Sequence, residues 1–397
     1  MRCGLSSLEL KAWKIAGYTT QLWLIGVASI GLSLRLQHFW PMASLPYQNW
    51  LHAHSHLAFL GWLFNGFYLH FTIQLPPRLK EEALHLFWVF QLLLIAIGFS
   101  FILSGYSTTS IVLTSLHTVG SVYFGCRWFY RWRHCLHGEW VHTANWAVVF
   151  MLLANLGPVG VAFGKSQELP WLFDASLHYY LYFNYTGWFT LAALAVWQQQ
   201  IRGIPNFWSN ILAIYSIVYY CISTFLPLDA RWYASPIVAI LLLVAWCRFP
   251  FYSLKQLTVE PPVSLLIGLS LIALVIRTTV EWVALWPAFG ALSVSIRAVQ
   301  IGYLHVFFLG IASAPLMASF GAGRLASALW VAGSWGSWLV LLGWPWLFPV
   351  ETALRYALIG LAALLLVAAI GAFLSTKSGV EESFFNRQKD KNGLKHP

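Results

Sequence analysis

Three histidines stand one residue apart near the start of an apolar segment, in the stretch WLHAHSHLAFLGW at residues 50–62. His52 and His56 are four positions apart, so on a helix they share a face, whereas His54 points about 200° away from both. Ionisable side chains are costly inside a membrane segment and mark functional sites there. Neutral imidazole is a ligand for iron, copper and zinc. The stretch therefore offers a ligand pair on one helix face and a single ligand on the other.

The composition around these histidines indicates an integral membrane protein. Of the 397 residues, 59% are hydrophobic and only 9% are charged, whereas soluble domains carry about 25% charged residues. The 23 Trp residues fit the same class, since Trp favours membrane interfaces. The net charge of +10 does not indicate nucleic-acid binding, because no basic soluble module accompanies it. The five cysteines lack C-x-x-C spacing, so neither a disulfide framework nor a thiolate metal site is predicted.

Apolar runs of about 20 residues can each cross a bilayer as a helix, and they predict an all-α integral membrane bundle of about twelve transmembrane helices. We expect these spans near residues 17–35, 49–74, 83–104, 108–128, 142–163, 175–200, 206–226, 232–248, 262–280, 297–318, 325–345 and 352–375. Residues 1–376 would form one polytopic transmembrane domain and residues 377–397 a short basic cytoplasmic tail. No repeat at a fixed period is evident.

The loop charges predict the orientation of the chain. With twelve crossings, both termini lie on the same side as most of the 23 Lys and Arg residues. The positive-inside rule identifies that side as the cytoplasm. We therefore expect a multi-pass protein of the bacterial inner membrane with both termini cytoplasmic.

This topology places several histidines from different spans in the outer half of the bundle, namely His52, His54, His56, His117, His178 and His305. At 1.5 Å rise per residue, His54 and His178 lie roughly 5–8 Å inside their helix starts and His305 about 12 Å inside. A lone His54 suits an axial heme position, whereas the His52–His56 pair could bind a metal with His178 as third ligand. Sequence alone leaves open which face of the second span points inward. Hydrogen bonding between helices is the other role open to each histidine.

Two short segments resemble known membrane heme proteins. The stretch HSHLAFLG at residues 54–61 is similar to the H-x-H-x-x-x-x-G stretch of the NnrS family, which is associated with nitric oxide stress, but Leu57 stands where that family has an acidic residue. It also resembles the second helix of heme-copper oxidase and nitric oxide reductase catalytic subunits, in which a His seven residues before a Gly ligates the low-spin heme. His54 is the matching position. In the expected tenth helix, GYLHVFFLG, His305 matches the second low-spin ligand and Tyr303 replaces the high-spin ligand.

The resemblance implies one heme held between His54 and His305, with Arg277, Arg297 or Arg355 available to pair with its propionates. The lack of a C-x-x-C-H attachment motif indicates heme b. The resemblance also implies that His178 takes the position of one ligand of the oxidase copper or non-heme iron site. The expected seventh helix has no histidine, so the usual binuclear centre cannot be assembled, and whether the chain is an enzyme stays open.

These patterns predict a membrane-bound b-type heme protein for electron transfer or nitric oxide handling. Its partners would be the lipid bilayer and a redox partner or a small gas such as nitric oxide. Three alternatives remain, one of which is a structural or assembly role with the histidines satisfied by hydrogen bonds. A divergent oxidase or reductase would add copper or non-heme iron at His52, His56 and His178. A multi-helix transporter without heme would use helix-interrupting residues such as Asn155 and Pro158 to line a site.

Overall fold

The structure, a computed structural model, describes residues 7–41, 46–201, 204–244, 261–347 and 350–379. All regular elements in these residues are helices, which confirms the predicted all-α class. Eight helices are long and apolar enough to cross a membrane: Lys11–Leu36, Pro77–Ser104, Glu139–Ser166, Phe207–Phe225, Pro262–Val283, Arg297–Ser319, Arg324–Leu342 and Glu351–Thr376. Each of the eight overlaps one of the expected spans.

The other four expected spans are also helical, but in the described residues none of them combines the length and the hydropathy of a membrane-crossing helix. A π segment does not by itself decide this, because the candidate span Arg297–Ser319 also contains one. The expected spans at 49–74 and 175–200 are each interrupted by a π-helical segment, and the one at 108–128 corresponds to α5. The eighth expected span is a shorter apolar helix, Arg231–Val244, whose predicted last residues 245–248 lie outside the described residues. Most of the predicted basic tail, residues 380–397, lies outside them too. Twelve complete spans are therefore not established.

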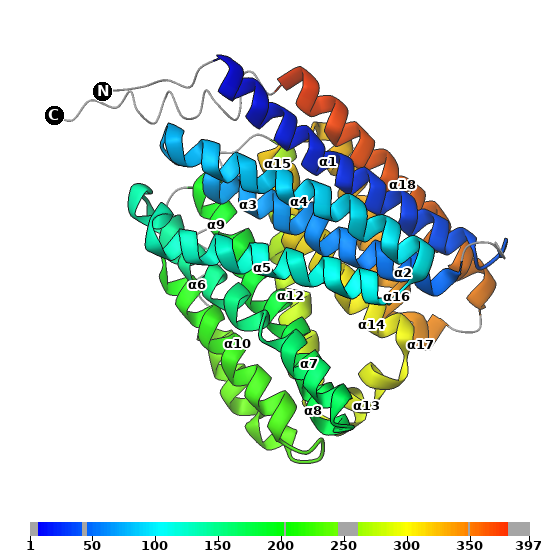
Figure 1. The fold of residues 1–397 in the computed structure, drawn as a ribbon. Coiled ribbons are helices and arrows are strands. Elements are labelled where there is room, and N and C mark those ends of the chain that lie inside the picture. Colours follow the sequence, from blue (N-terminus) through cyan, green and yellow to red (C-terminus); the bar gives the residue numbers. More distant parts are fainter. Residues whose placement is uncertain (1–6, 42–45, 202–203, 245–260, 348–349, 380–397) are drawn as a thin grey trace. The chain divides into compact units, whose positions relative to one another are not determined.

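The chain divides into two compact units, and unit 1 comprises residues 1–117, 260–270 and 313–397. Its complete helical elements are α1 (Ser7–Leu36), α2 (Tyr47–His56), η1 (Leu57–Phe64), α3 (Asn65–Thr72), α4 (Pro77–Ser104), α15 (Ser313–Ser319), α16 (Arg324–Leu342), α17 (Trp344–Leu347) and α18 (Glu351–Gly379). The long helix α18 packs against α1 and α16 (Figure 1). Helix α1 also contacts α2 and η1, so the first helix holds the histidine-bearing segment in place.

Unit 2 comprises residues 118–259 and 271–312. Its complete elements are η2 (Trp132–Cys135), α6 (Glu139–Ala154), α7 (Gly157–Ser166), α8 (Pro170–Tyr182), η3 (Phe183–Phe189), α9 (Thr190–Gln200), α10 (Phe207–Phe225), η4 (Arg231–Ala234), α13 (Pro287–Ser295), α14 (Arg297–His305) and η5 (Val306–Ala312). Two further helices, α5 (Thr108–Tyr130) and α12 (Pro261–Val283), contribute residues to both units. Within unit 2, α7 pairs with α8, and α6 packs along η3 and α9.

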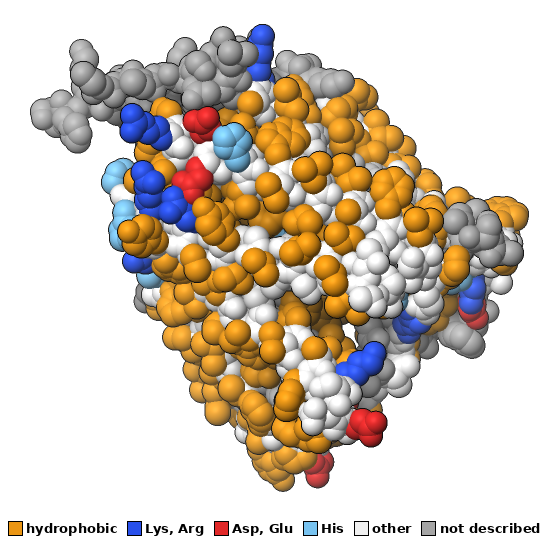
Figure 2. All heavy atoms as spheres, viewed as in Figure 1, with side chains coloured by type: hydrophobic (Ala, Val, Ile, Leu, Met, Phe, Trp, Pro, Cys, Tyr) orange, Lys and Arg blue, Asp and Glu red, His pale blue; other side chains and the backbone are white. Residues whose placement is uncertain are grey.

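The outward faces of the helices are apolar. On α4, for example, the exposed side chains include Val89, Leu92, Ile95, Phe99 and Leu103. Figure 2 shows hydrophobic side chains along the length of the helices and charged side chains gathered near helix ends. Contiguous apolar surface of this extent is unusual on a soluble monomer. It is the surface that lipid contact requires, because a helix satisfies its own backbone hydrogen bonds inside the bilayer.

Three π-helical segments repeat one local pattern. They begin at Leu57, Phe183 and Val306, at nearly equal intervals along the chain. Each follows a His or Tyr and has a Gly five residues after it: His56 and Gly61, Tyr182 and Gly187, His305 and Gly310. This repeat is not apparent from the sequence alone, because the three segments share only a His or Tyr that is followed five residues later by a Gly.

The glycines of the π segments bring neighbouring helices close. A Cβ atom at Gly61 would lie 3.1 Å from ring atoms of Trp23 on α1, and one at Gly187 would lie 2.3 Å from the ring of Phe150 on α6. A π turn adds a residue to the helical turn and is frequent at functional sites. Here the widened turns directly follow His56, Tyr182 and His305, and the two histidines are candidate ligands.

Candidate functional site

His54 on α2 is oriented by α1. Its Nδ1 lies 3.0 Å from the carbonyl oxygen of Val27, and because a carbonyl only accepts, Nδ1 carries the proton and donates it. Nε2 then keeps its lone pair, which is the state that binds a metal. Nε2 has no hydrogen-bond partner among the described residues. The ring fits over Gly31, where an added Cβ would lie only 3.0 Å from Cε1 of His54.

His305 at the end of α14 has the same tautomer. Its Nδ1 donates to the carbonyl oxygen of Ile301, one turn earlier, at 2.7 Å. Nε2 is therefore the nitrogen that carries the lone pair. His54 belongs to unit 1 and His305 to unit 2. The axial pairing expected from the sequence stays a prediction, and each of its two histidines has the protonation state that the prediction requires.

His52 and His56 lie on the opposite face of α2 from His54, and both contact Tyr106 in the loop that follows α4. The ring of Tyr106 is 4.5 Å from that of His52, edge on, and its hydroxyl is 3.1 Å from Nε2 of His56. His56 also stacks on Phe101 of α4, with ring centroids 4.2 Å apart and planes at 12°. The pair therefore points away from α1 and toward the end of α4.

His178 lies in unit 2, on α8. Its Nε2 is 3.1 Å from the hydroxyl of Ser223, and its ring lies beside those of Tyr182 and Tyr220. In the part of the chain that the structure describes, no three His, Cys, Asp or Glu side chains group closely enough to hold a metal ion. The expected metal site of His178 with the pair on α2 would join residues of different units and stays a prediction.

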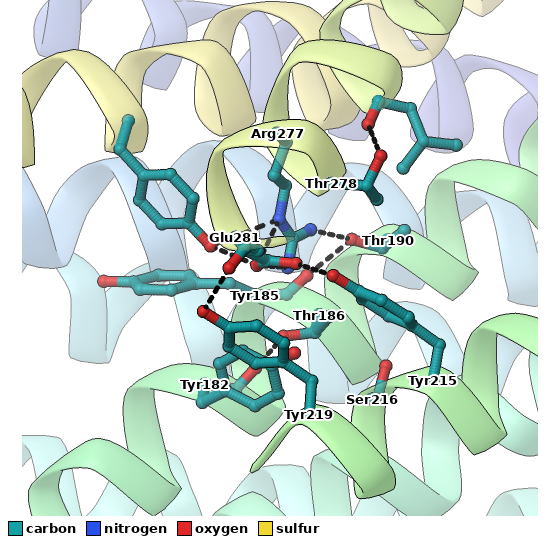
Figure 3. Close-up of polar contacts among 12 residues, drawn as sticks. Tyr182, Tyr185, Thr186, Thr190, Tyr215, Ser216, Tyr219, Arg277, Thr278 and Glu281 are labelled. Carbon is teal, nitrogen blue, oxygen red and sulfur yellow. Dashed lines mark hydrogen bonds and ion pairs between the residues drawn. The ribbon is translucent and has the colours of Figure 1, made fainter. Parts of the chain in front are cut away.

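A buried ion pair forms the polar centre of unit 2 (Figure 3). On α12, Arg277 is 1% exposed and Glu281, one turn later, is 3% exposed. Nε and Nη2 of Arg277 each donate to Oε1 of Glu281 at 3.1 Å. The third guanidinium nitrogen, Nη1, donates to the hydroxyl of Thr190 at 2.8 Å, and the guanidinium lies over the ring of Phe307. Burial of such a pair is tolerated only when its polar atoms are satisfied in this way.

Tyrosines complete the hydrogen bonding of Glu281. Tyr215 donates to Oε2 at 2.5 Å, Tyr303 donates to Oε1, and Tyr219 donates to the backbone carbonyl of Glu281 at 3.0 Å. With Thr190, these residues come from α9, α10, α12 and α14 (Figure 3). The Arg277–Glu281 network therefore ties four helices together. Through Tyr303 it holds α14, on which His305 follows two residues later.

The sequence analysis singled out Arg277 and Tyr303 but gave them other roles. Arg277 was expected to face a heme propionate; in the structure its Nε, Nη1 and Nη2 donate within unit 2. Another predicted propionate partner, Arg297, is exposed at the first position of α14. Glu281 was missed, although a signal was present: the sequence RTTVE places opposite charges at i and i+4 within an apolar helix.

No protein-family model matches the chain, and no curated protein matches it in sequence.

Proposed function

We propose that this protein is a b-type heme protein of the bacterial inner membrane in which His54 and His305 are the axial ligands. The observation that carries the proposal is the hydrogen bond from Nδ1 of each imidazole to a backbone carbonyl. Such a bond fixes the tautomer and raises the basicity of the ligating nitrogen. His305 directly precedes one π segment and His54 lies three residues before another, and π turns are frequent at functional sites.

Electron transfer is the activity that this ligand set supports best. A heme with two tightly bound imidazoles has no open position for a gas, and it supplies reversible one-electron chemistry when bound. The protein would then accept electrons from a redox partner in or at the membrane. The guanidinium of Arg297, exposed at the start of α14, is suited to pair with a propionate.

The test is the absorbance spectrum of the full-length protein purified in detergent, oxidised and then dithionite-reduced, with heme counted per chain. We expect a low-spin heme in the wild type and its loss or conversion in His54→Ala and in His305→Ala. His85→Ala removes an exposed histidine of α4 and is the matched control. A colourless wild-type protein from heme-sufficient cells contradicts the proposal, and so does an unchanged spectrum in both single variants.

A second test displaces the His54 ring without changing it. In Gly31→Val the new side chain enters the space of the imidazole, since even a Cβ would be 3.0 Å from Cε1. Overpacking costs about 1–3 kcal/mol, so we expect heme affinity to fall by about 5- to 150-fold. Gly26→Val on the same helix meets nothing within 4 Å and should keep the wild-type affinity. Equal heme affinity in the two variants would show that the position of the His54 ring does not matter.

A further inference from the structure

The second face of α2 carries donor atoms that the proposed heme does not use. His52 and His56 are one helical turn apart, and Tyr106 lies against both rings. All three residues belong to unit 1. Nothing in the heme proposal explains why two imidazoles and a phenol should meet at one place.

The distance between Tyr106 and His56 fits two ligands of one metal ion. Imidazole nitrogens and oxygen ligands bind at about 2.0–2.2 Å, so two of them at right or tetrahedral angles lie about 2.8–3.6 Å apart. The hydroxyl of Tyr106 and Nε2 of His56 are 3.1 Å apart. Stacking on the fully buried ring of Phe101 holds the His56 imidazole in this orientation.

His52 supplies a third donor. Its ring stands edge on to Tyr106 at 4.5 Å, and neither of its nitrogens has a hydrogen-bond partner among the described residues. A histidine pair at i and i+4 presents both rings on one helix face, the spacing used by helical metal sites. Tyr106 is 61% exposed, so an ion can reach the three side chains from outside the helix bundle.

The loop after α4 holds Tyr106 in this position. Gly105 has φ of +58°, a backbone conformation that favours glycine, and a Cβ there would lie 2.5 Å from Oδ1 of Asn49 on α2. Asn49 donates to the carbonyl oxygen of Ile102 at 3.3 Å, and Ser110 donates to that of Gly105 at 2.8 Å. The turn is therefore tied to α2 on one side and to α5 on the other.

We propose that His52, His56 and Tyr106 form a copper(II) site. Two neutral imidazoles with one phenolate are ligands that favour Cu²⁺ over the other divalent first-row ions. On binding, the Tyr106 hydroxyl exchanges its O–H bond for a bond to copper and releases one proton to solvent, with no change in oxidation state. The site takes its third ligand from Tyr106, whereas the sequence analysis expected His178. It is independent of the heme, which uses the other face of α2.

The experiment is a Cu²⁺ titration of the full-length protein, freed of metal with a chelator and followed by electron paramagnetic resonance and visible absorbance. We expect one tight site per chain with nitrogen hyperfine splitting and a phenolate-to-copper charge-transfer band. His52→Ala and His56→Ala should weaken binding by more than about a hundredfold, because losing even a residue that only supports a ligand costs about 10–100-fold. Tyr106→Phe should abolish the charge-transfer band.

The controls separate this site from copper on surface histidines. His85→Ala and His137→Ala remove exposed imidazoles outside it and should keep wild-type binding. His52 makes no hydrogen bond among the described residues, so His52→Gln should fold even if a change at the stacked His56 does not. Wild-type affinity in His52→Ala and His52→Gln would overturn the proposal. Loss of the tight site in His85→Ala, or no tight site in the wild type, would also overturn it.

Discussion

Arg277→Met is expected to lower the free energy of unfolding by about 3–5 kcal/mol, because it leaves a buried carboxylate without its counter-charge. Glu281 is 3% exposed and accepts two hydrogen bonds from the guanidinium. Water cannot replace these donors at a position so far from solvent. Equilibrium unfolding in mixed micelles measures the loss. Glu281→Leu should cost a similar amount, since it leaves the guanidinium unpaired.

The chain offers a matched control for this prediction. Arg355 and Glu351 on α18 form a second i, i+4 pair, but their side chains are 39% and 35% exposed. Exposed pairs contribute about 0–1 kcal/mol, so Arg355→Met should change stability by no more than that. The double variant Arg277→Met with Glu281→Leu should lose much less than the sum of the single changes. If Arg277→Met costs no more than Arg355→Met, the buried pair does not stabilise unit 2.

Gly164→Val is expected to destabilise the protein by about 1–3 kcal/mol or more, because the new side chain meets backbone. A Cβ at Gly164 on α7 would lie 2.7 Å from the backbone nitrogen of Phe173 on α8 and 3.0 Å from its Cα. A flexible side chain could rotate away from such a contact, but helix backbone cannot. The whole of α8 would have to shift, including His178. Unfolding measurements in micelles give the loss of stability.

The reason for this sensitivity is a row of small residues between α7 and α8. A Cβ at Gly157 would lie 2.5 Å from Cβ of Tyr180, and one at Gly160 would lie 2.3 Å from the hydroxyl of Ser176. Small residues at this spacing let transmembrane helices approach closely and pack by van der Waals contact. Gly360→Val on α18 meets nothing within 4 Å and is the control. If both variants lose the same stability, the loss comes from placing valine in a helix and not from the contact between α7 and α8.

Several features of this protein could be predicted from sequence because they depend on local properties. The all-α class follows from the apolar runs, since a chain in lipid has to satisfy its backbone hydrogen bonds within each segment. Helical periodicity alone placed His52 and His56 on one face and His54 on the other, as the structure has them. Periodicity left open which residues each face of α2 contacts.

The positions of the π turns were harder to predict. Composition does not distinguish a regular helix from one that contains a π turn, and the segments Leu57–Phe64 and Phe183–Phe189 contain no proline that would break a helix. Where such a turn forms depends on the helix that packs against it. The close contacts of Gly61 with Trp23 and of Gly187 with Phe150 become apparent only in the tertiary structure.

Sequence by itself determined the class of protein, the positions of its long apolar helices and the faces of the histidines on α2. Only the tertiary structure decided the partners of these side chains, because those partners lie far along the chain. Tyr106 meets His56 across 50 residues, Tyr215 meets Glu281 across 66, and Arg277 meets Thr190 across 87. Hydropathy and periodicity act over one or two helical turns. Contacts between residues so far apart in the chain are set by helix packing. Packing places the candidate ligands and the buried ion pair beside the residues that hydrogen-bond to them.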